Sequence, residues 1–339
     1  MYLKQLSVAE LIDLAESDDD FDTLIDLSKY YALIKSDLTD LMPYEYDLFI
    51  SKLLKNPHLP LVALLNLYAF VQHTEYEKDL NKHPNYLNCD PSDLAGYMYS
   101  PSVSRRIGIA AHPKCPSAVL DQLSSDTAYE VRGAVSKNLN TSFYTLLKLA
   151  YPFKEHVLKH PTYVNCDVNE LLSYKNDSDK NVRSGVALNS KCPPDVLQEL
   201  SQDTTKDVQL CVLSNSNCPS SVFKRLITAK ANFLFRCAAA ENKNCPEDLL
   251  IKLSKDKDES VRETVGENPR AFDIPQIAIN LKALNKKKVD EYEGEENEDD
   301  SYLSDILPKN LNAPSHLHKS INTDLELLLA LHKYLTRGN

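Results

Sequence analysis

The stretch NSKCPPDVLQELSQD runs from Asn189 to Asp203 and has two close relatives elsewhere in the chain. They are HPKCPSAVLDQLSSD, from His112 to Asp126, and NKNCPEDLLIKLSKD, from Asn242 to Asp256. Each begins with Asn or His, places Cys-Pro three residues later and ends in Asp. A pattern that returns in this form indicates an internal structural repeat, and a repeat decides the architecture of the whole chain.

We call the Asn or His that opens each unit its anchor. Successive anchors are separated by 27, 29, 26, 22, 29, 26, 27, 26 and 42 residues, so the period is about 26 and one unit is short. The anchors are Asn56, His83, His112, Asn138, His160, Asn189, Asn215, Asn242, Asn268 and Asn310. We expect the three histidines to be turn residues, because they replace Asn at the same position.

Each unit reads as two short helices. Pro116 suits the first position of a helix, and Val119, Leu120 and Leu123 give that helix one apolar face. Asp126 is then expected to cap the second helix. Helices this short are marginal alone and must bury their apolar faces on neighbouring units. The sequence therefore predicts an all-α, right-handed α-solenoid of about ten two-helix repeats with helical caps.

Four segments are expected along the chain. Residues 1–55 would form an N-terminal helical cap and residues 56–285 the repeat solenoid. Residues 286–301, which include DEYEGEENEDD, would form an acidic flexible insertion. Residues 302–339 would hold a final repeat and a C-terminal capping helix. The formal net charge of −11 is concentrated in residues 10–26 and 290–300, so the repeats between them are mildly basic.

The consensus V-R-x-x-V-x-x-N-x-x-C-P-x-x-x-L-x-x-L-S-x-D resembles the variant leucine-rich repeat, an α-helical solenoid family. It is carried by Val131–Asn138, Val182–Asp203, Val208–Pro219, Arg236–Asp256 and Val261–Asn268, within residues 101–270, and is weaker over 50–100. The resemblance implies alternation of an α-helix with a second, often 3₁₀, helix. An iron–sulfur module found in one family member is not implied, since the first cysteine here is Cys89. A six-residue spacing from Asp to Arg also resembles the HEAT repeat.

Four cysteines, Cys115, Cys192, Cys218 and Cys245, hold one position in four units. Stacked helices lie roughly 8–10 Å apart, which exceeds the reach of a disulfide or of ligands to one zinc ion. The same position holds Thr141, Ala271 and Ala313 in other units. We therefore expect these cysteines to be small buried apolar residues, with no metal and no cofactor.

An arginine recurs after the first Val-like residue of several units, and Gln209 replaces it in one. The residues of this arginine ladder are Arg106, Arg132, Arg183, Arg236 and Arg262. In one interpretation, each pairs with a capping aspartate of its own or the next unit, such as Asp126, Asp177 or Asp256, in a partly buried seam. The alternative is a row of guanidinium groups that binds a partner from a concave face. The sequence leaves both open, and the five arginines are the candidate partner-binding residues.

A catalytic centre needs different functional groups at one point. Identical residues that recur along a repeat instead provide an extended surface. With seven glycines, no Gly-rich phosphate loop is found, and no hydrolase or metalloprotease motif occurs. We expect a non-catalytic scaffold that binds a protein partner. The alternative is nucleic acid, held by the arginine ladder and the lysines around Lys286, as in HEAT-like DNA glycosylases, although the chain has no Trp. No apolar run is long enough to span a membrane and no secretion signal is visible, so we expect cytoplasmic localisation with reduced thiols.

Overall fold

A computed structural model describes residues 8–36, 43–281 and 283 of the chain. These residues are helical or irregular, and none of them is in a β-strand, which confirms the all-α prediction. The chain divides into two compact units, Met1–Cys166 and Asp167–Asn339. The predicted insertion at 286–301, the final repeat at 302–339 and the anchor Asn310 lie outside the described residues.

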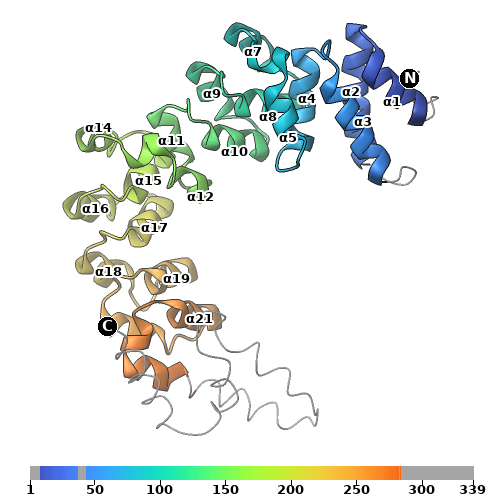
Figure 1. Ribbon diagram of the computed structural model, residues 1–339. Coiled ribbons are helices and arrows are strands. Elements are labelled where there is room, and N and C mark those ends of the chain that lie inside the picture. Colours follow the sequence, from blue (N-terminus) through green and yellow to red (C-terminus); the bar gives the residue numbers. More distant parts are fainter. Residues whose placement is uncertain (1–7, 37–42, 282, 284–339) are drawn as a thin grey trace, which may run out of the picture. The chain divides into compact units, whose positions relative to one another are not determined.

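Unit 1 is built from short helices that follow one another in chain order (Figure 1). The helices of unit 1 are α1 (Val8–Ser17), α2 (Phe21–Ser36), α3 (Pro43–Lys55), α4 (Leu61–Val71), α5 (Glu77–Lys82), α6 (Pro84–Leu87), α7 (Pro91–Tyr97), α8 (Val103–Ala111), α9 (Ser117–Leu123), α10 (Tyr129–Lys137), α11 (Phe143–Leu149), α12 (Lys154–Val157) and α13 (Pro161–Val164).

Unit 2 repeats the same two-helix pattern more regularly. Its helices are α14 (Val168–Ser173), α15 (Lys180–Leu188), α16 (Pro194–Leu200), α17 (Lys206–Ser214), α18 (Ser220–Leu226), α19 (Phe233–Glu241), α20 (Glu247–Leu253), α21 (Glu259–Glu267) and the 3₁₀ turn η2 (Ala271–Asp273). A further helical segment begins at residue 275.

From α8 onward within unit 1, and throughout unit 2, the helices that end at or shortly before an anchor, which we call pre-anchor helices, pack directly on one another. In unit 1, α8 packs against α10 and α10 against α12, and α8 also packs on α4. In unit 2 the order is α15, α17, α19 and α21, each against the next. The helix after each anchor closes the core beside its own pre-anchor helix, as α9 does on α8 and α10. Each unit thus buries an apolar face that no single repeat can bury alone.

The turn between the two helices differs in detail from the sequence prediction. Pro116 is the N-cap of α9, with extended backbone, and the helix begins one residue later at Ser117. The N-cap of α10 is Ala128, so the prediction of Asp126 as that cap is wrong. The Asp126 carboxylate instead accepts the Ala128 N–H at 2.8 Å, from two residues upstream. This position leaves its second oxygen free for another donor.

Repeat-like contacts also occur within residues 1–55, where we expected a cap. Helix α1 packs against α3, and α2 packs against α4. The buried anchor Asn56 donates from Nδ2 to the carbonyls of Ala15, at 3.1 Å, and Asp18, at 2.8 Å. The later anchors bond to the preceding helix in the same way, so the stacking extends further than the repeat motif.

One close approach of two helices depends on glycine. Gly108 of α8 lies against the backbone of Leu65 in α4, and a Cβ at position 108 would stand 2.9 Å from the Leu65 Cα. Helix α4 is the most apolar in unit 1, and seven of its residues are buried. Across the described ranges, no helix combines the length and apolar character that crossing a bilayer requires.

Candidate functional site

The asparagine anchors tie each repeat to the one before it. Asn138 donates from Nδ2 to the carbonyls of Ala110, at 2.7 Å, and His112, at 2.9 Å, and its Oδ1 accepts the Asn140 N–H at 2.9 Å. The same pattern recurs at Asn215, Asn242 and Asn268. All four side chains are buried, so each satisfies carbonyls at a helix end that water does not reach.

The histidine anchors make part of this pattern. His83, His112 and His160 are buried, and the Nε2 of each bonds to a backbone carbonyl of the preceding unit at 2.9–3.0 Å. Nδ1 of His83 and of His112 accepts a backbone N–H two residues on. Nδ1 of His160 has no hydrogen-bond partner in the described part of the chain. The predicted turn position is confirmed, and these bonds assign the Nε2–H tautomer, which makes the rings structural.

The four repeated cysteines are buried, as the sequence predicted. Cys115, Cys192 and Cys245 are 0% exposed and Cys218 is 5% exposed. Burial raises the pKa of each thiol to about 12, so the thiolate is scarce at neutral pH. Thr141 and Ala271, which take the same position, are buried as well. Small size and burial therefore define this position.

The one Cys–His contact that the described residues show does not form a nucleophile–base pair. Cys89 Sγ lies 3.4 Å from His112 Nε2, but that nitrogen already donates to the Tyr86 carbonyl at 2.9 Å. A nitrogen that carries its proton cannot take one from the thiol. Burial raises the pKa of Cys89 and lowers the pKa of His112, so both groups stay neutral.

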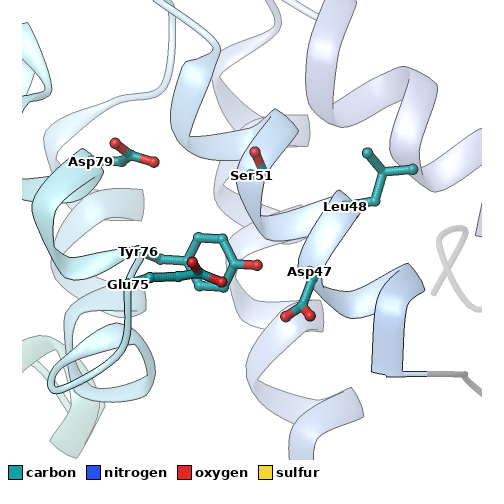
Figure 2. A pocket seen from close by; sticks show the side chains of 6 residues that line it. All are labelled: Asp47, Leu48, Ser51, Glu75, Tyr76 and Asp79. Atoms are coloured by element: carbon teal, nitrogen blue, oxygen red, sulfur yellow. The ribbon is translucent and has the colours of Figure 1, made fainter.

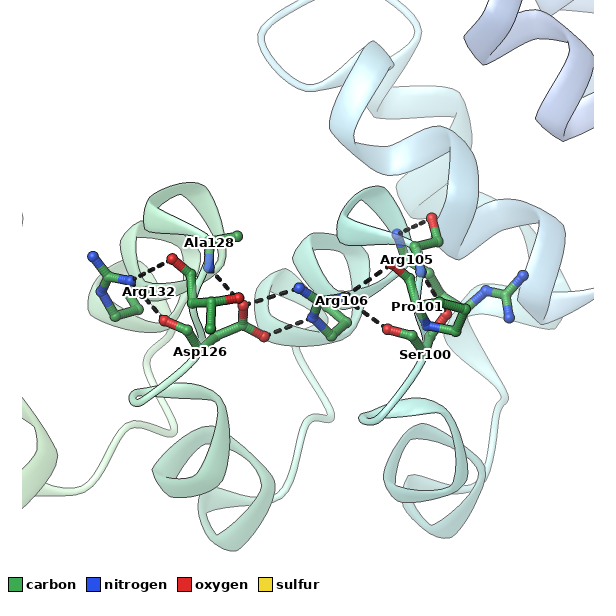
Figure 3. Close-up of polar contacts among 9 residues, drawn as sticks. Ser100, Pro101, Arg105, Arg106, Asp126, Ala128 and Arg132 are labelled. Atoms are coloured by element: carbon green, nitrogen blue, oxygen red, sulfur yellow. Dashed lines mark hydrogen bonds and ion pairs between the residues drawn. The ribbon is translucent and has the colours of Figure 1, made fainter.

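Three arginines of the ladder form ion pairs with an aspartate of the next repeat. Arg106 donates from Nε and Nη2 to the two carboxylate oxygens of Asp126, at 2.6 and 3.0 Å, as Figure 3 shows. Arg183 binds the Asp203 carboxylate in the same bidentate geometry, at 2.6 and 3.1 Å. Arg236 reaches Asp256 at 2.8 Å. In all three pairs the aspartate lies twenty residues after the arginine.

Three ladder arginines have an aspartate six residues before them. This aspartate accepts a hydrogen bond from the arginine through its backbone carbonyl and not through its carboxylate. Arg132 donates from Nη1 to the Asp126 carbonyl at 2.6 Å, Arg183 to the Asp177 carbonyl at 2.7 Å and Arg262 to the Asp256 carbonyl at 2.7 Å. Gln209 makes the same bond from Nε2 to the Asp203 carbonyl at 2.7 Å. The capping bond therefore needs one N–H donor and no charge.

All three ion pairs are partly buried, and the Arg106–Asp126 pair shifts the pKa of both partners. The side chains of Arg106 and Asp126 are 13% and 8% exposed. Burial tends to raise the pKa of Asp126, but the hydrogen bonds from Arg106 and the Ala128 N–H, with the charges of Arg106 and Arg132, outweigh it and lower that pKa. The hydrogen bond to Asp126 raises the pKa of Arg106. The pair stays charged at neutral pH, with its charges mutually neutralised.

Arg132 differs from these three. Position 152, twenty residues on, is Pro152, and within the described ranges Arg132 has no ion pair with a carboxylate. Its guanidinium carbon lies 5.7 Å from the centre of the Tyr129 ring, which in turn packs on Phe153 with ring centres 4.6 Å apart. The corresponding position for Arg262 is residue 282, which lies outside the described residues. The ladder thus combines three neutralised arginines with one that lacks a carboxylate partner.

At one position beside the ladder, three of the six helices that carry a ladder residue or Gln209 expose an apolar side chain, two in unit 1 and one in unit 2. Lys180, Lys206 and Glu259 take this position in the other three. Val103, Tyr129 and Phe233 each precede a ladder arginine by three residues and begin a pre-anchor helix. They are 40%, 55% and 39% exposed. Two large neighbours, Tyr99 and Leu234, are exposed to 78% and 56%. We call Val103, Tyr129 and Phe233 the apolar row; sequence analysis did not identify it, although the three-residue offset from Arg106, Arg132 and Arg236 is visible in the sequence.

A shallow recess lies between α3 and the turn after α4. Figure 2 shows its lining, which consists of Asp47, Leu48, Ser51, Glu75, Tyr76 and Asp79. Desolvation raises the pKa of Tyr76, and the hydrogen bond and charge of Asp47 add to this effect, so the phenol stays protonated. Among described residues, no group of three or more His, Cys, Asp or Glu is arranged to hold a metal ion.

Comparison with known proteins gives one kind of match. No family model matches the chain, and no curated protein matches it. A solved structure described as a leucine-rich repeat variant with a novel repetitive protein structural motif is similar to this chain, at 17% identity and a TM-score of 0.31. The match covers 73% of this chain and 85% of that one. The hydrogen-bond ladders of the chain itself remain the basis for assigning it to the helical repeat proteins.

Proposed function

We propose that the chain is a non-catalytic repeat scaffold that binds another protein through the exposed starts of its pre-anchor helices. The observation that carries this proposal is the apolar row of Val103, Tyr129 and Phe233, exposed at one repeat position. Burying such side chains against a partner is favourable by about 25 cal/mol per Å² of apolar surface. Aromatic residues are also enriched among those that dominate binding energy at protein interfaces.

The state of the arginine ladder favours protein over nucleic acid as the partner. Affinity for nucleic acid depends on several free cations that displace counterions from phosphates. Arg106, Arg183 and Arg236 are each in an ion pair within the fold, so their charges are already compensated. The side chains exposed beside Arg106 and Arg236, Val103 and Phe233, are apolar, which suits a protein surface.

The row can be tested by charge insertion at positions that tolerate it. Val103 and Phe233 are the first residues of α8 and α19, where an aspartate interacts favourably with the helix dipole. The double variant Val103→Asp, Phe233→Asp should therefore keep its thermal melting curve. In affinity capture at moderate salt, the wild type should retain a protein partner even after nuclease treatment. The double variant should no longer retain it.

A matched control is Leu139→Asp, because Leu139 is 72% exposed but lies just after the anchor Asn138, away from the helix starts. This variant should retain the partner. Equal retention by the double variant, or captured material that nuclease removes, would contradict the proposal.

A further inference from the structure

We propose that Arg132 is an open receptor for a carboxylate, and that it binds an acidic side chain of a partner protein beside the exposed ring of Tyr129. This inference rests on the proposed function and names the chemistry of the partner segment. Three features carry it: the geometry of the equivalent arginines, the missing aspartate in the next unit, and the charge around Arg132.

The equivalent arginines show what the fold does with this guanidinium. Arg106 and Arg183 use Nη1 for backbone carbonyls of their own unit and present the edge formed by Nε and Nη2 to the next unit. That edge holds an aspartate by two parallel bonds of 2.6 and 3.0–3.1 Å in both cases. Two-pronged arginine–carboxylate pairs are among the stronger hydrogen-bonded contacts in proteins.

At Arg132 the same edge has no carboxylate from the described residues. Nη1 keeps its bonds to the carbonyls of Asp126, at 2.6 Å, and Thr127, at 3.1 Å, and these hold the side chain in the ladder orientation. The next unit, from Asn138 to His160, is four residues shorter than the 26-residue unit before it and carries Pro152 at the aspartate position. Figure 3 shows the second terminal nitrogen of Arg132 without a contact among the residues drawn, whereas Arg106 is fully engaged.

The charge around this edge favours an acidic partner. Residues 129–160 contain five Lys or Arg and two acids, Glu130 and Glu155. Burial lowers the pKa of His156, and the positive charges of Lys137 and Lys159 lower it further, against the opposite effect of Glu155. Lys154, at the start of α12, lies over the Tyr151 ring at 5.5 Å. A carboxylate on Arg132 would reduce the mutual repulsion of these cations.

A protein segment fits this surface better than a nucleic acid. The proposed binding group is the single guanidinium of Arg132, because its neighbour on the ladder, Arg106, is already paired with Asp126. The exposed side chain beside Arg132, Tyr129, presents an aromatic ring, while its hydroxyl donates to the Pro152 carbonyl. The segment that matches both is a peptide in which Asp or Glu stands beside an aromatic or aliphatic residue.

The chain itself supplies a substitution that removes the fork without removing the capping bond. Gln209 stands at the ladder position in α17 and still donates to the Asp203 carbonyl at 2.7 Å. Arg132→Gln should therefore keep the bond to Asp126 and lose the two-pronged edge and its charge. Lys114→Gln is the matched control, because it removes one exposed charge from the same unit away from the ladder.

The test measures the binding of a short fluorescent peptide of alternating Glu and Phe by anisotropy at low salt. We expect Arg132→Gln to raise its dissociation constant about 10-fold or more and Lys114→Gln to change it less than about 3-fold, because charge-assisted bonds are stronger than long-range attraction. Arg132→Lys, which keeps the charge but not the fork, should also weaken binding. Thermal melting curves confirm that the variants are folded.

Three results would overturn the inference. They are equal binding by the wild type and Arg132→Gln, equal binding of a peptide with Gln in place of Glu, and tighter binding of a single-stranded oligonucleotide with the same dependence on Arg132. The partner capture that depends on Val103 and Phe233 is measured separately, so the acidic-segment inference can fail while the proposed function stands.

Discussion

Two neighbouring units, from His112 to Asn138 and from Asn138 to His160, differ by four residues in length and by the completeness of their contacts. In the first, Asn138 makes three bonds and Asp126 receives both prongs of Arg106. In the second, His160 makes one bond from Nε2 with its Nδ1 unpartnered, and no described carboxylate pairs with Arg132.

The difference shows that helix stacking continues through a shorter repeat, whereas the ion pair depends on the residue type at one position. The pre-anchor contacts continue, because α10 still packs on α12. The ion pair needs an aspartate twenty residues after the arginine, and Pro152 replaces it there. Pro152 lies as far from Asn138 as Asp126 lies from His112, so the four missing residues fall after it and the substitution alone removes the pair. Among the described residues, Arg132 has no carboxylate in place of this aspartate. Its guanidinium therefore keeps a charged edge that is paired inside the fold at Arg106 and Arg183.

The largest effect is expected at Asn138, the anchor at which the complete unit ends and the short unit begins. Asn138→Ala removes two donors to buried carbonyls and the acceptor for the Asn140 N–H, so the free energy of unfolding should fall by about 3 kcal/mol. Urea unfolding followed by far-UV circular dichroism measures this. His160→Asn should change stability by less than about 1 kcal/mol, since it replaces a single bond. An equal loss in both variants would break the comparison.

A second contrast uses two glycines. A Cβ at Gly108 would meet the backbone of Leu65, which cannot move aside, so Gly108→Ala should cost about 1–3 kcal/mol. A Cβ at Gly133 would meet the Phe153 ring of the short unit at 3.3 Å, and a side chain can turn away. Gly133→Ala should therefore cost less than about 1 kcal/mol in the same assay. A greater loss at Gly133 would show that the short unit is the more rigidly packed of the two.

The ion-paired region should be sensitive to acid. Because the folded pKa of Asp126 is lowered from its ordinary value of 3.8, its contribution to stability is present above that value and is lost as the pH falls through the lowered folded value. Urea midpoints measured from about pH 6 to about pH 3 should fall, and Arg106→Gln should reduce that fall. An unchanged acid dependence in Arg106→Gln would contradict the assignment of this pair.

A small effect is also expected at the repeated cysteine position. Cys192→Ala should cost about 1 kcal/mol, because Ala271 already fills the same buried position in another unit. The Cys192 thiol, with its pKa raised to about 12, should react with a thiol reagent only as fast as the fold opens. Rapid modification in the folded protein would contradict its burial. Thr141→Ala in the short unit should cost more, because the Thr141 hydroxyl donates to the Val135 carbonyl at 2.6 Å.

Much of this architecture follows from sequence periodicity. The spacing of anchors predicted stacked helix pairs, and the substitution of Cys by Thr141 and Ala271 predicted a small buried residue. Both predictions needed only local pattern. The partnership of Arg106 with Asp126 was foreseen as an Asp–Arg seam, with the partner in the same unit or the next left open.

The remaining features depend on how one unit lies on the next. The Asp126 carboxylate pairs with the arginine twenty residues before it and its carbonyl with the one six residues after it, and no local rule separates these roles. The contacts of Asn56 with Ala15 and Asp18 were hidden because helices α1 and α2 lack the Cys-Pro motif. The lack of a described carboxylate partner for Arg132 could be inferred only after the structure showed that the partner aspartate lies twenty residues after each paired arginine.

The most direct test of the ladder compares Arg106→Gln with Arg132→Gln in urea unfolding at neutral pH. Glutamine keeps the capping bond at both positions, as Gln209 does, so the comparison isolates the ion pair. We predict that Arg106→Gln lowers the free energy of unfolding by about 2 kcal/mol, because Asp126 is left without its cation. Arg132→Gln should change it by less than about 1 kcal/mol. Equal losses at the two positions would show that Arg132 has an internal partner after all, and would contradict the account.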